Sequence, residues 1–106
     1  MLFTISGKHV SIPEAVRQHA EEKTSKLVKY YSGINQIEVV IDASRAGNTG
    51  VEVIARGEHS NVFVATESGQ DVYQCIDTAV HKLEQQLRRK KTRERDRKHT
   101  GGAEAS

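Results

Sequence analysis

The chain has 106 residues, 36% of them hydrophobic and 28% charged, which is the size and composition of one small domain. No stretch approaches the roughly 20 apolar residues of a membrane-spanning helix, and a single cysteine excludes an internal disulfide, so we expect a protein of the reducing cytoplasm without membrane contact. The net charge of +2 is unevenly distributed, because residues 1–87 carry 8 basic and 11 acidic side chains and residues 88–99 carry 8 and 2.

The first predicted elements are a short strand and a long helix. Residues 2–6 combine β-branched and aromatic side chains before a glycine and are typical of a strand. A helix over residues 13–31 is predicted by a capping box, in which Ser11 and Glu14 exchange hydrogen bonds, and by Pro13 in the first turn. Its apolar stripe consists of Ile12, Val16, Ala20, Leu27 and Tyr31.

Three strands follow, at residues 37–43, 51–56 and 61–66, where apolar and polar side chains alternate with period two. Glycine-containing turns at residues 47–50 and 57–60 separate them and favour antiparallel hairpins.

A second helix is predicted to begin at the Ser-x-x-acid pattern of residues 68–71. Beyond Leu87 the apolar residues stop while helix-favouring Arg, Lys and Glu continue, so this helix should run past the body of the domain. We expect one domain over residues 1–99 and a disordered tail over residues 100–106. The stripe of the second helix consists of Val72, Tyr73, Ile76, Val80, Leu83 and Leu87.

The element order is therefore β-α-β-β-β-α. Two amphipathic helices and four strands bury their apolar surfaces if both helices pack on one face of a single sheet. The predicted fold class is α+β.

The strongest functional signal is the basic end of the second helix. On a helical wheel Lys82, Arg89 and Arg93 lie together on the side away from the apolar stripe. Cations this dense repel one another, and bound phosphates would relieve that repulsion, which favours nucleic acid as the partner. A solvated helix end that complements the helix dipole is the alternative, although it needs only one or two cations. Five further basic residues surround this cluster of cations on the second helix: Lys90, Lys91, Arg95, Arg97 and Lys98.

A weaker basic cluster lies on the first helix and consists of Arg17, Lys23, Lys26 and Lys29. Taken alone, these are ordinary surface side chains. If both helices pack on one face of the sheet, however, the two clusters come to one surface.

Signals for an enzyme are poor. The histidines have no metal-ligand spacing, and Cys75 has no identifiable base, so we interpret it as structural. Asp71 and Asp77 point to different helix faces, and the glycines do not form a phosphate-binding loop. We expect no catalytic residues, no metal and no cofactor.

The sequence resembles the ribosome hibernation-promoting factors from residue 1 to about residue 99. The most specific element is Gly-Gln-Asp-x-Tyr-x-x-Ile-Asp at residues 69–77. The run Ile-Asn-Gln-Ile-Glu-Val-Val-Ile at residues 34–41 and Lys-Thr-Ser-Lys-Leu at residues 23–27 add to it. The short final segment with one acid resembles the short hibernation factor more than the related inhibitor, which has a longer acidic tail.

The resemblance implies a fold similar to a double-stranded RNA-binding domain. It implies a monomer that binds the small ribosomal subunit through 16S rRNA, in the channel for messenger and transfer RNA, and silences translation in stationary phase or stress. A ribosome-dimerising protein is a further partner that the family allows. Basic positions matching the family's rRNA contacts are Lys23, Lys26, Lys82, Arg89, Lys91, Arg93 and Arg95, to which Arg88 and Lys90 add charge. Gln85 departs from the family pattern, which has Arg there.

Two alternatives stay open on the sequence. The fold also suits a general double-stranded RNA-binding domain, and the protruding helix suits a protein-binding regulator of an alternative sigma factor. The sheet has only Phe3 and Phe63 as aromatic residues, which disfavours reading of single-stranded bases by the sheet.

Overall fold

The computed structural model describes the backbone of residues 1–105 and the side chains of residues 1–44 and 46–93. The elements are β1 (Leu2–Lys8), α1 (Glu14–Thr24), the short 3-10 helix η1 (Ser25–Lys29), β2 (Ile34–Arg45), β3 (Asn48–Gly57), the 3-10 turn η2 (Glu58–Ser60), β4 (Val62–Gly69) and α2 (Val72–Ala105). The predicted element order and the α+β fold class are confirmed.

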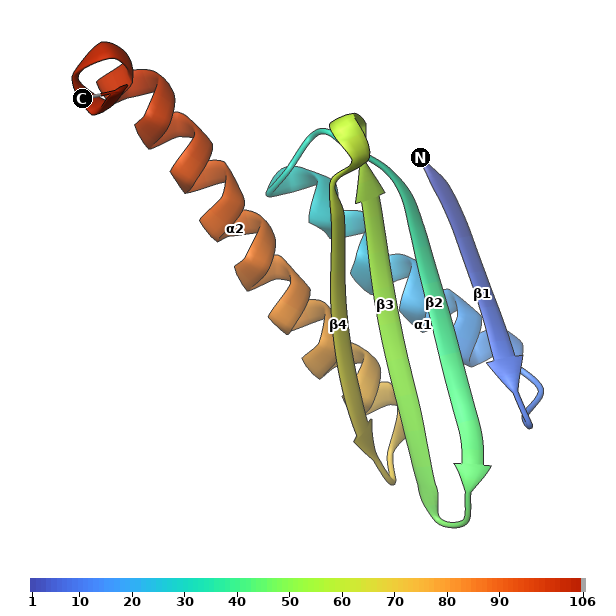
Figure 1. The fold of residues 1–106 in the computed structure, drawn as a ribbon. Coiled ribbons are helices and arrows are strands. Elements are labelled where there is room, and N and C mark those ends of the chain that lie inside the picture. The colour runs from blue at the N-terminus through green and yellow to red at the C-terminus, as the bar shows by residue number, and fades with distance from the viewer. Residues whose placement is uncertain (106) are drawn as a thin grey trace.

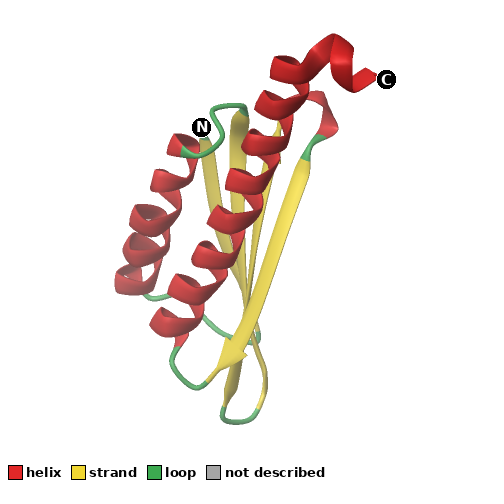
Figure 2. Cartoon of the chain, turned by 90° about the vertical axis from the view of Figure 1, so that its left-hand side faces the viewer, coloured by secondary structure: helices red, strands yellow, loops and turns green. Residues whose placement is uncertain are grey.

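The strands form one sheet in the order β1-β2-β3-β4, in which β1 and β2 are parallel and the other two pairs are antiparallel. A parallel pair needs a crossover connection, and α1 with η1 provides it. Figures 1 and 2 show that both helices cover the same face of the sheet, while the other face is left open. The helix layer and the open face are therefore two chemically separate surfaces.

The core lies between the helix layer and the sheet, as the alternation predicted. Ile37, Val39 and Val53 are fully buried on the covered face, and the polar or half-exposed residues between them lie on the open face. From α2, the stripe Ile76, Val80, Leu83 and Leu87 packs onto this layer. Burying one such aliphatic side chain stabilises the domain by roughly 1.5–3 kcal/mol.

Two positions on α2 differ from the predicted stripe. Tyr73 is exposed, and its ring lies beside α1 instead of in the core, where it meets His19 edge-on with centroids 5.1 Å apart. Cys75, predicted off the stripe, is 4% exposed and lies against Gly69 and the Thr49 carbonyl. The reason is that β3 and β4 reach further along the first turn of α2 than the apolar pattern indicates.

The first helix is shorter than the predicted residues 13–31. α1 ends at Thr24, and the backbone continues as the 3-10 helix η1. The buried Thr24 hydroxyl donates to the Ala20 carbonyl at 2.8 Å, and the Ser25 hydroxyl donates to the Glu22 carbonyl at 2.8 Å. Such back-bonding competes with the regular hydrogen-bond ladder and bends helices, which accounts for the change of helix type here.

Neither predicted capping box forms as expected. Pro13 is itself the extended N-cap of α1, so Ser11 lies outside the helix and makes no capping hydrogen bond. At α2, β4 continues to Gly69 and the cap falls on Asp71 instead of Ser68. Asp71 Oδ1 accepts from the backbone N–H groups of Tyr73 and Gln74 at 3.0 and 3.5 Å.

The strands extend further than the apolar alternation predicted. β2 and β3 pair up to Arg45 opposite Asn48, so the turn is the two-residue loop Ala46-Gly47 instead of residues 47–50. Gly47 has a φ of 69°, which is the left-handed conformation that such tight hairpin loops require. Backbone pairing continues there although none of the described side chains of residues 42–44 and 46–50 is buried.

The outer edge of β4 is covered by α2. Lys82 Nζ donates to the Thr66 carbonyl at 3.0 Å, and Gln86 Nε2 donates to the Val64 carbonyl at 2.8 Å. Exposed strand edges invite pairing with other chains. The hydrogen bonds from Lys82 and Gln86 occupy two carbonyl groups of β4 to which a strand of another chain could otherwise bind.

Helical backbone in α2 continues to Ala105, beyond the end of the sheet, and no helix among the described residues is both long and apolar enough to cross a membrane. The side chains of residues 94–106 lie outside the described part of the chain, and so does any contact that they make. The domain of residues 1–99 and the disordered tail of residues 100–106 stay predictions.

The packing predicts the effect of shortening Leu83, which is fully buried between α2 and the sheet. Leu83→Ala should lower the free energy of unfolding by about 2–5 kcal/mol, because it removes buried methyl groups and leaves a cavity. Urea denaturation measures this. Thr92→Ala, at an exposed position of the same helix, is the matched control and should change stability by less than about 0.5 kcal/mol. Equal effects of the two variants would contradict the packing.

The cap of α2 predicts a second effect. Asp71→Ala removes the acceptor for two backbone N–H groups and should cost about 1 kcal/mol of stability. Asp71→Asn keeps an acceptor oxygen and should lose much less. Thermal unfolding of the two variants side by side checks this, and an unchanged melting temperature for Asp71→Ala would be inconsistent with the cap.

Candidate nucleic-acid interface

The basic side chains of α2 lie on two flanks of the helix, on either side of the stripe that packs on the sheet. One flank faces α1 and η1 across a groove and carries Arg88, with Lys91 one turn further along. The other flank follows the outer edge of β4 and carries Lys82, Arg89 and Arg93 at helical spacing. We call these the groove flank and the edge flank.

The groove between the helices has a volume of about 300 Å³. Its floor is apolar and is formed by Leu27 and Val80. Lys23 and Lys26 line it from the α1 and η1 side, so the structure brings these two predicted residues next to α2. On the α2 side it is lined by Asp77, His81 and Glu84.

Arg88 contacts two of the residues that line the groove, Tyr30 and Glu84. Its guanidinium carbon lies 5.7 Å from the centroid of the Tyr30 ring, and its Nη1 lies 3.5 Å from Glu84 Oε2. The side chain is 64% exposed, so both contacts are made at the surface. The sequence identified Arg88 as part of the basic helix end. It could not identify the aromatic ring beneath Arg88, because Tyr30 lies in a different part of the chain.

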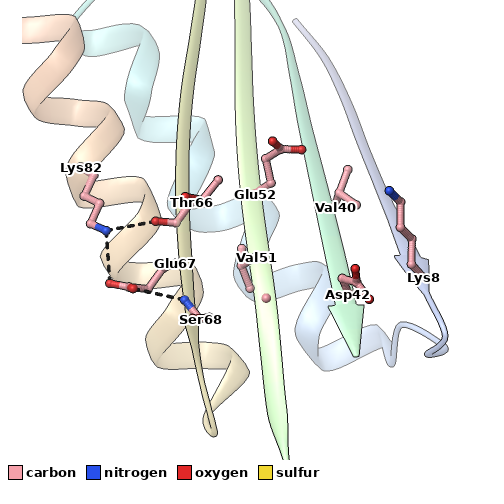
Figure 3. Close-up of a pocket in the computed structure, with 10 residues that line it drawn as sticks. Lys8, Val40, Asp42, Val51, Glu52, Thr66, Glu67, Ser68 and Lys82 are labelled. Atoms are coloured by element: carbon pink, nitrogen blue, oxygen red, sulfur yellow. Dashed lines mark hydrogen bonds and ion pairs between the residues drawn. The ribbon is translucent and has the colours of Figure 1, made fainter. Parts of the chain in front are cut away.

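On the edge flank, Lys82 is engaged within the fold. Besides the Thr66 carbonyl, its Nζ contacts Glu67 Oε2 at 3.4 Å, as Figure 3 shows. This predicted contact residue is therefore already neutralised by an ion pair on the β4 edge. The helical wheel placed Lys82 with Arg89 and Arg93 on the side away from the apolar stripe, but the structure places Lys82 against the edge of β4, whose position the wheel could not show.

The remaining predicted residues lie further along α2. Three cations are exposed and form no ion pair with any described residue: Arg89, Lys91 and Arg93. Lys90 differs from them, because it is half-buried and interacts with another group of the protein. Arg95 lies outside the residues whose side chains are described. Gln85, the departure from the family pattern, is exposed beside His81 at 3.3 Å. Exposed cations thus follow Leu87 on both flanks of α2, and the helix itself continues past the end of the sheet (Figure 1).

The two helices are held together by a contact that the sequence did not indicate. His19 Nε2 on α1 lies 2.7 Å from Asp77 Oδ1 on α2, and the same imidazole packs against Tyr73. Nothing local marks this pair, because the two residues are 58 positions apart. The contact helps to set the width of the groove.

The aromatic residues of the sheet do not form a base-stacking platform. Phe3 and Phe63 are half-buried and pack against the core, and Phe63 meets Tyr31 edge-on at 5.6 Å. This agrees with the prediction that the sheet does not read single-stranded bases.

Catalytic or metal-binding groups do not gather in the described part of the chain. It contains no cluster of three His, Cys, Asp or Glu side chains that could hold a metal ion. Burial raises the pKa of the Cys75 thiol, and Glu67 and Asp71 raise it further, so the thiol stays protonated and is a poor nucleophile. This buried environment agrees with the prediction that Cys75 has a structural role and is not a nucleophile.

The open face has a shallow pocket with charges of both signs (Figure 3). Lys8 and Lys82 lie at its two sides, and Asp42, Glu52 and Glu67 lie between them. Hydrogen bonds from Ser44 lower the pKa of Asp42, which keeps this carboxylate ionised. A surface with this many carboxylates repels phosphate, so the helix side is the better candidate for nucleic acid.

Comparison with known proteins identifies relatives along most of the chain. The Escherichia coli (strain K12) ribosome hibernation promoting factor is 34% identical over 93 residues, which are 86% of this chain and 94% of that protein. The Lactococcus lactis ribosome hibernation promotion factor is 32% identical over 92 residues, and there the chain spans about half of the relative's length, 50%. These names are not those of enzymes, in agreement with the prediction.

Solved structures share the fold. A ribosomal subunit interface protein from Coxiella burnetii has a TM-score of 0.79 at 24% identity, covering 87% of this chain and 99% of that one. The N-terminal domain of Thermus thermophilus Protein Y has a TM-score of 0.73 at 27% identity, covering 84% and 98%. The resemblance predicted from residues 69–77 is thus confirmed. The family described as Sigma 54 modulation protein / S30EA ribosomal protein matches residues 3–95, and the chain belongs to that family.

Proposed function

We propose that this protein binds the small ribosomal subunit through 16S rRNA, in the channel for messenger and transfer RNA, and silences translation in stationary phase or stress. The hibernation role of the E. coli relative, which this chain matches over 94% of that protein, supports a ribosome-associated role. The single observation that carries the proposal is the group of exposed cations that follows Leu87 on α2. Such a role places the protein in the cytoplasm.

The physical basis is phosphate binding by a preformed surface. Arg89, Lys91 and Arg93 have no ion pair among the described residues, and Arg89 and Arg93, four positions apart on one flank, repel each other in the unbound protein. Phosphates relieve this repulsion and release counterions on binding. The molecule is elongated, with extents of 54 × 23 × 19 Å, so α2 can reach into a channel that the body of the domain need not enter.

Inhibition then follows from occupancy. A protein that fills a channel used by messenger and transfer RNA blocks it without chemistry, cofactor or metal. Structured RNA is recognised chiefly through phosphates and shape, which suits a rigid helix with a basic surface. We propose that the protein acts as a monomer, and that any pairing of silenced ribosomes requires a separate partner protein.

The family description also names modulation of sigma 54, which keeps a protein partner as the second candidate. A protein interface would depend on packing more than on counterion release. Salt dependence therefore separates the two candidates.

Binding to purified small subunits should weaken steeply with salt. With about six phosphate contacts, the affinity should fall by about 10³-fold between 50 and 200 mM salt. Co-sedimentation at a series of salt concentrations measures this. A flat salt response would refute a phosphate interface and favour the protein-partner candidate.

Neutralising two exposed cations of α2 should weaken binding without unfolding the domain. For Arg89→Gln/Lys91→Gln, the slope of log K against log salt should fall by about two, because each lost phosphate contact removes about one unit. The thermal stability should stay within about 0.5 kcal/mol per substitution.

The matched control for this variant is Lys8→Gln/Arg56→Gln, which removes the same charge from the open face. Arg56 pairs there with Glu38 at 2.9 Å, and because both side chains stay partly exposed to solvent, the pair contributes only about 1 kcal/mol. The control should bind subunits much like the wild type. If both variants lose binding equally, only the overall charge matters and the interface proposed here is wrong.

A further inference from the structure

The groove between η1 and α2 combines an aromatic ring, an apolar floor and two lysines. We propose that it binds one unpaired nucleobase of the RNA partner, stacked on the ring of Tyr30, with the adjoining phosphates held by Lys23 and Lys26. This inference rests on the proposed function and adds a base-binding site to an interface otherwise made of phosphate contacts.

Tyr30 lines the groove and has the larger of its two ring side chains, the other being the imidazole of His81. Tyr31 and Phe63 pack on each other at the core, and Tyr73 lies at the far end of the helix pair against His19. Tyr30 is half-buried, and the guanidinium of Arg88 lies over its ring, 5.7 Å from the centroid. A planar cation therefore already approaches this ring from the solvent side, where a planar base would stack.

Arg88 can give way to a base. It is 64% exposed, and its other contact is the surface ion pair with Glu84 at 3.5 Å, an interaction worth about 0–1 kcal/mol when exposed. A guanidinium stacks on bases as well as on aromatic rings, so the displaced side chain can cover the base from its other side. Displacement thus costs little and leaves the cation beside the RNA.

The charges of the groove select a base over a phosphate. Lys23 and Lys26 lie along one side, and Asp77 and Glu84 lie along the other. A phosphate that moved into the groove would approach both carboxylates, whereas an uncharged base would not be repelled. Carboxylate oxygens also accept hydrogen bonds from exocyclic amino groups of bases. The phosphates accordingly stay at the lysine side while the base enters.

The size of the groove favours a single unpaired base. About 300 Å³ is at the lower limit of small-ligand sites, and Leu27 and Val80 provide an apolar floor of the kind on which a base edge can rest. A base within a duplex cannot enter such a groove without leaving its stack. The site therefore requires a loop, a bulge or a single-stranded end in the RNA.

The chain has no tryptophan, so Tyr30→Trp introduces a unique fluorophore that keeps an aromatic ring at the site. The probe is a single-stranded RNA of mixed sequence, about 12 nucleotides long to match the reach of one such surface, compared with an abasic ribose-phosphate strand of equal length. Stacking should quench the emission with the RNA and not with the abasic strand. Tyr73→Trp, on the same helix layer but outside the groove, is the matched control and should not be quenched by either strand.

Binding to purified small subunits gives the second readout. Tyr30→Leu should lower the affinity about tenfold, because it removes a base–aromatic stack, while the slope of log K against log salt stays unchanged. Tyr30→Phe keeps the ring and should restore wild-type affinity. Thermal melts of each variant show that the domain is folded.

The outcomes separate the base site from the proposed function. If Tyr30→Leu binds subunits as tightly as the wild type and RNA leaves the emission of the Tyr30→Trp variant unchanged, the base site is overturned while the phosphate interface stands. If the wild type fails to bind subunits but RNA quenches only Tyr30→Trp, the base site stands and the ribosomal partner is wrong. Equal quenching by the abasic strand would show a phosphate effect and would also overturn the base site.

Discussion

The packing of the apolar stripe of α2 on β3 and β4 is the constraint on which the rest of this structure depends. One side of the helix must bury Ile76, Leu83 and Leu87, and this fixes its rotation about its own axis. Once that rotation is set, it determines which positions of α2 face the groove and which face the edge of β4. The apolar stripe thereby decides which cations serve the fold and which face a partner.

This division explains why the number of basic residues overstates the size of the interface. Lys82 is bound to Glu67 and to a carbonyl of β4, so its charge protects the sheet edge. Arg89 and Lys91 lie only about two to two and a half turns further on, and they meet no acidic partner among the described residues. The same residue types therefore change role along one helix, according to what lies beneath them.

The helix layer also joins two elements that are far apart in the chain into one surface. The contact of His19 with Asp77 at 2.7 Å holds α1 beside α2, and the groove exists because both helices lie on the same face of the sheet. The change from α1 to η1 after Thr24 carries Lys26 and Tyr30 toward α2. A base site at Tyr30 would thus depend on that change of helix type, and it would complement the sequence-independent phosphate contacts of α2.

By itself, the sequence determined the order of the elements, the covered faces of β2 and β3, the core stripe from Ile76 to Leu87 and the basic end of α2. These follow from periodicity and from charge, which are local properties: apolar positions repeat with the period of the element that buries them, and a dense row of cations cannot be buried. Tertiary structure alone decided the burial of Cys75, the engagement of Lys82 and the groove around Tyr30. Each of these depends on an atom from a distant segment, such as the Thr66 carbonyl beneath Lys82, whose position no local pattern can specify before the sheet and the helices are assembled.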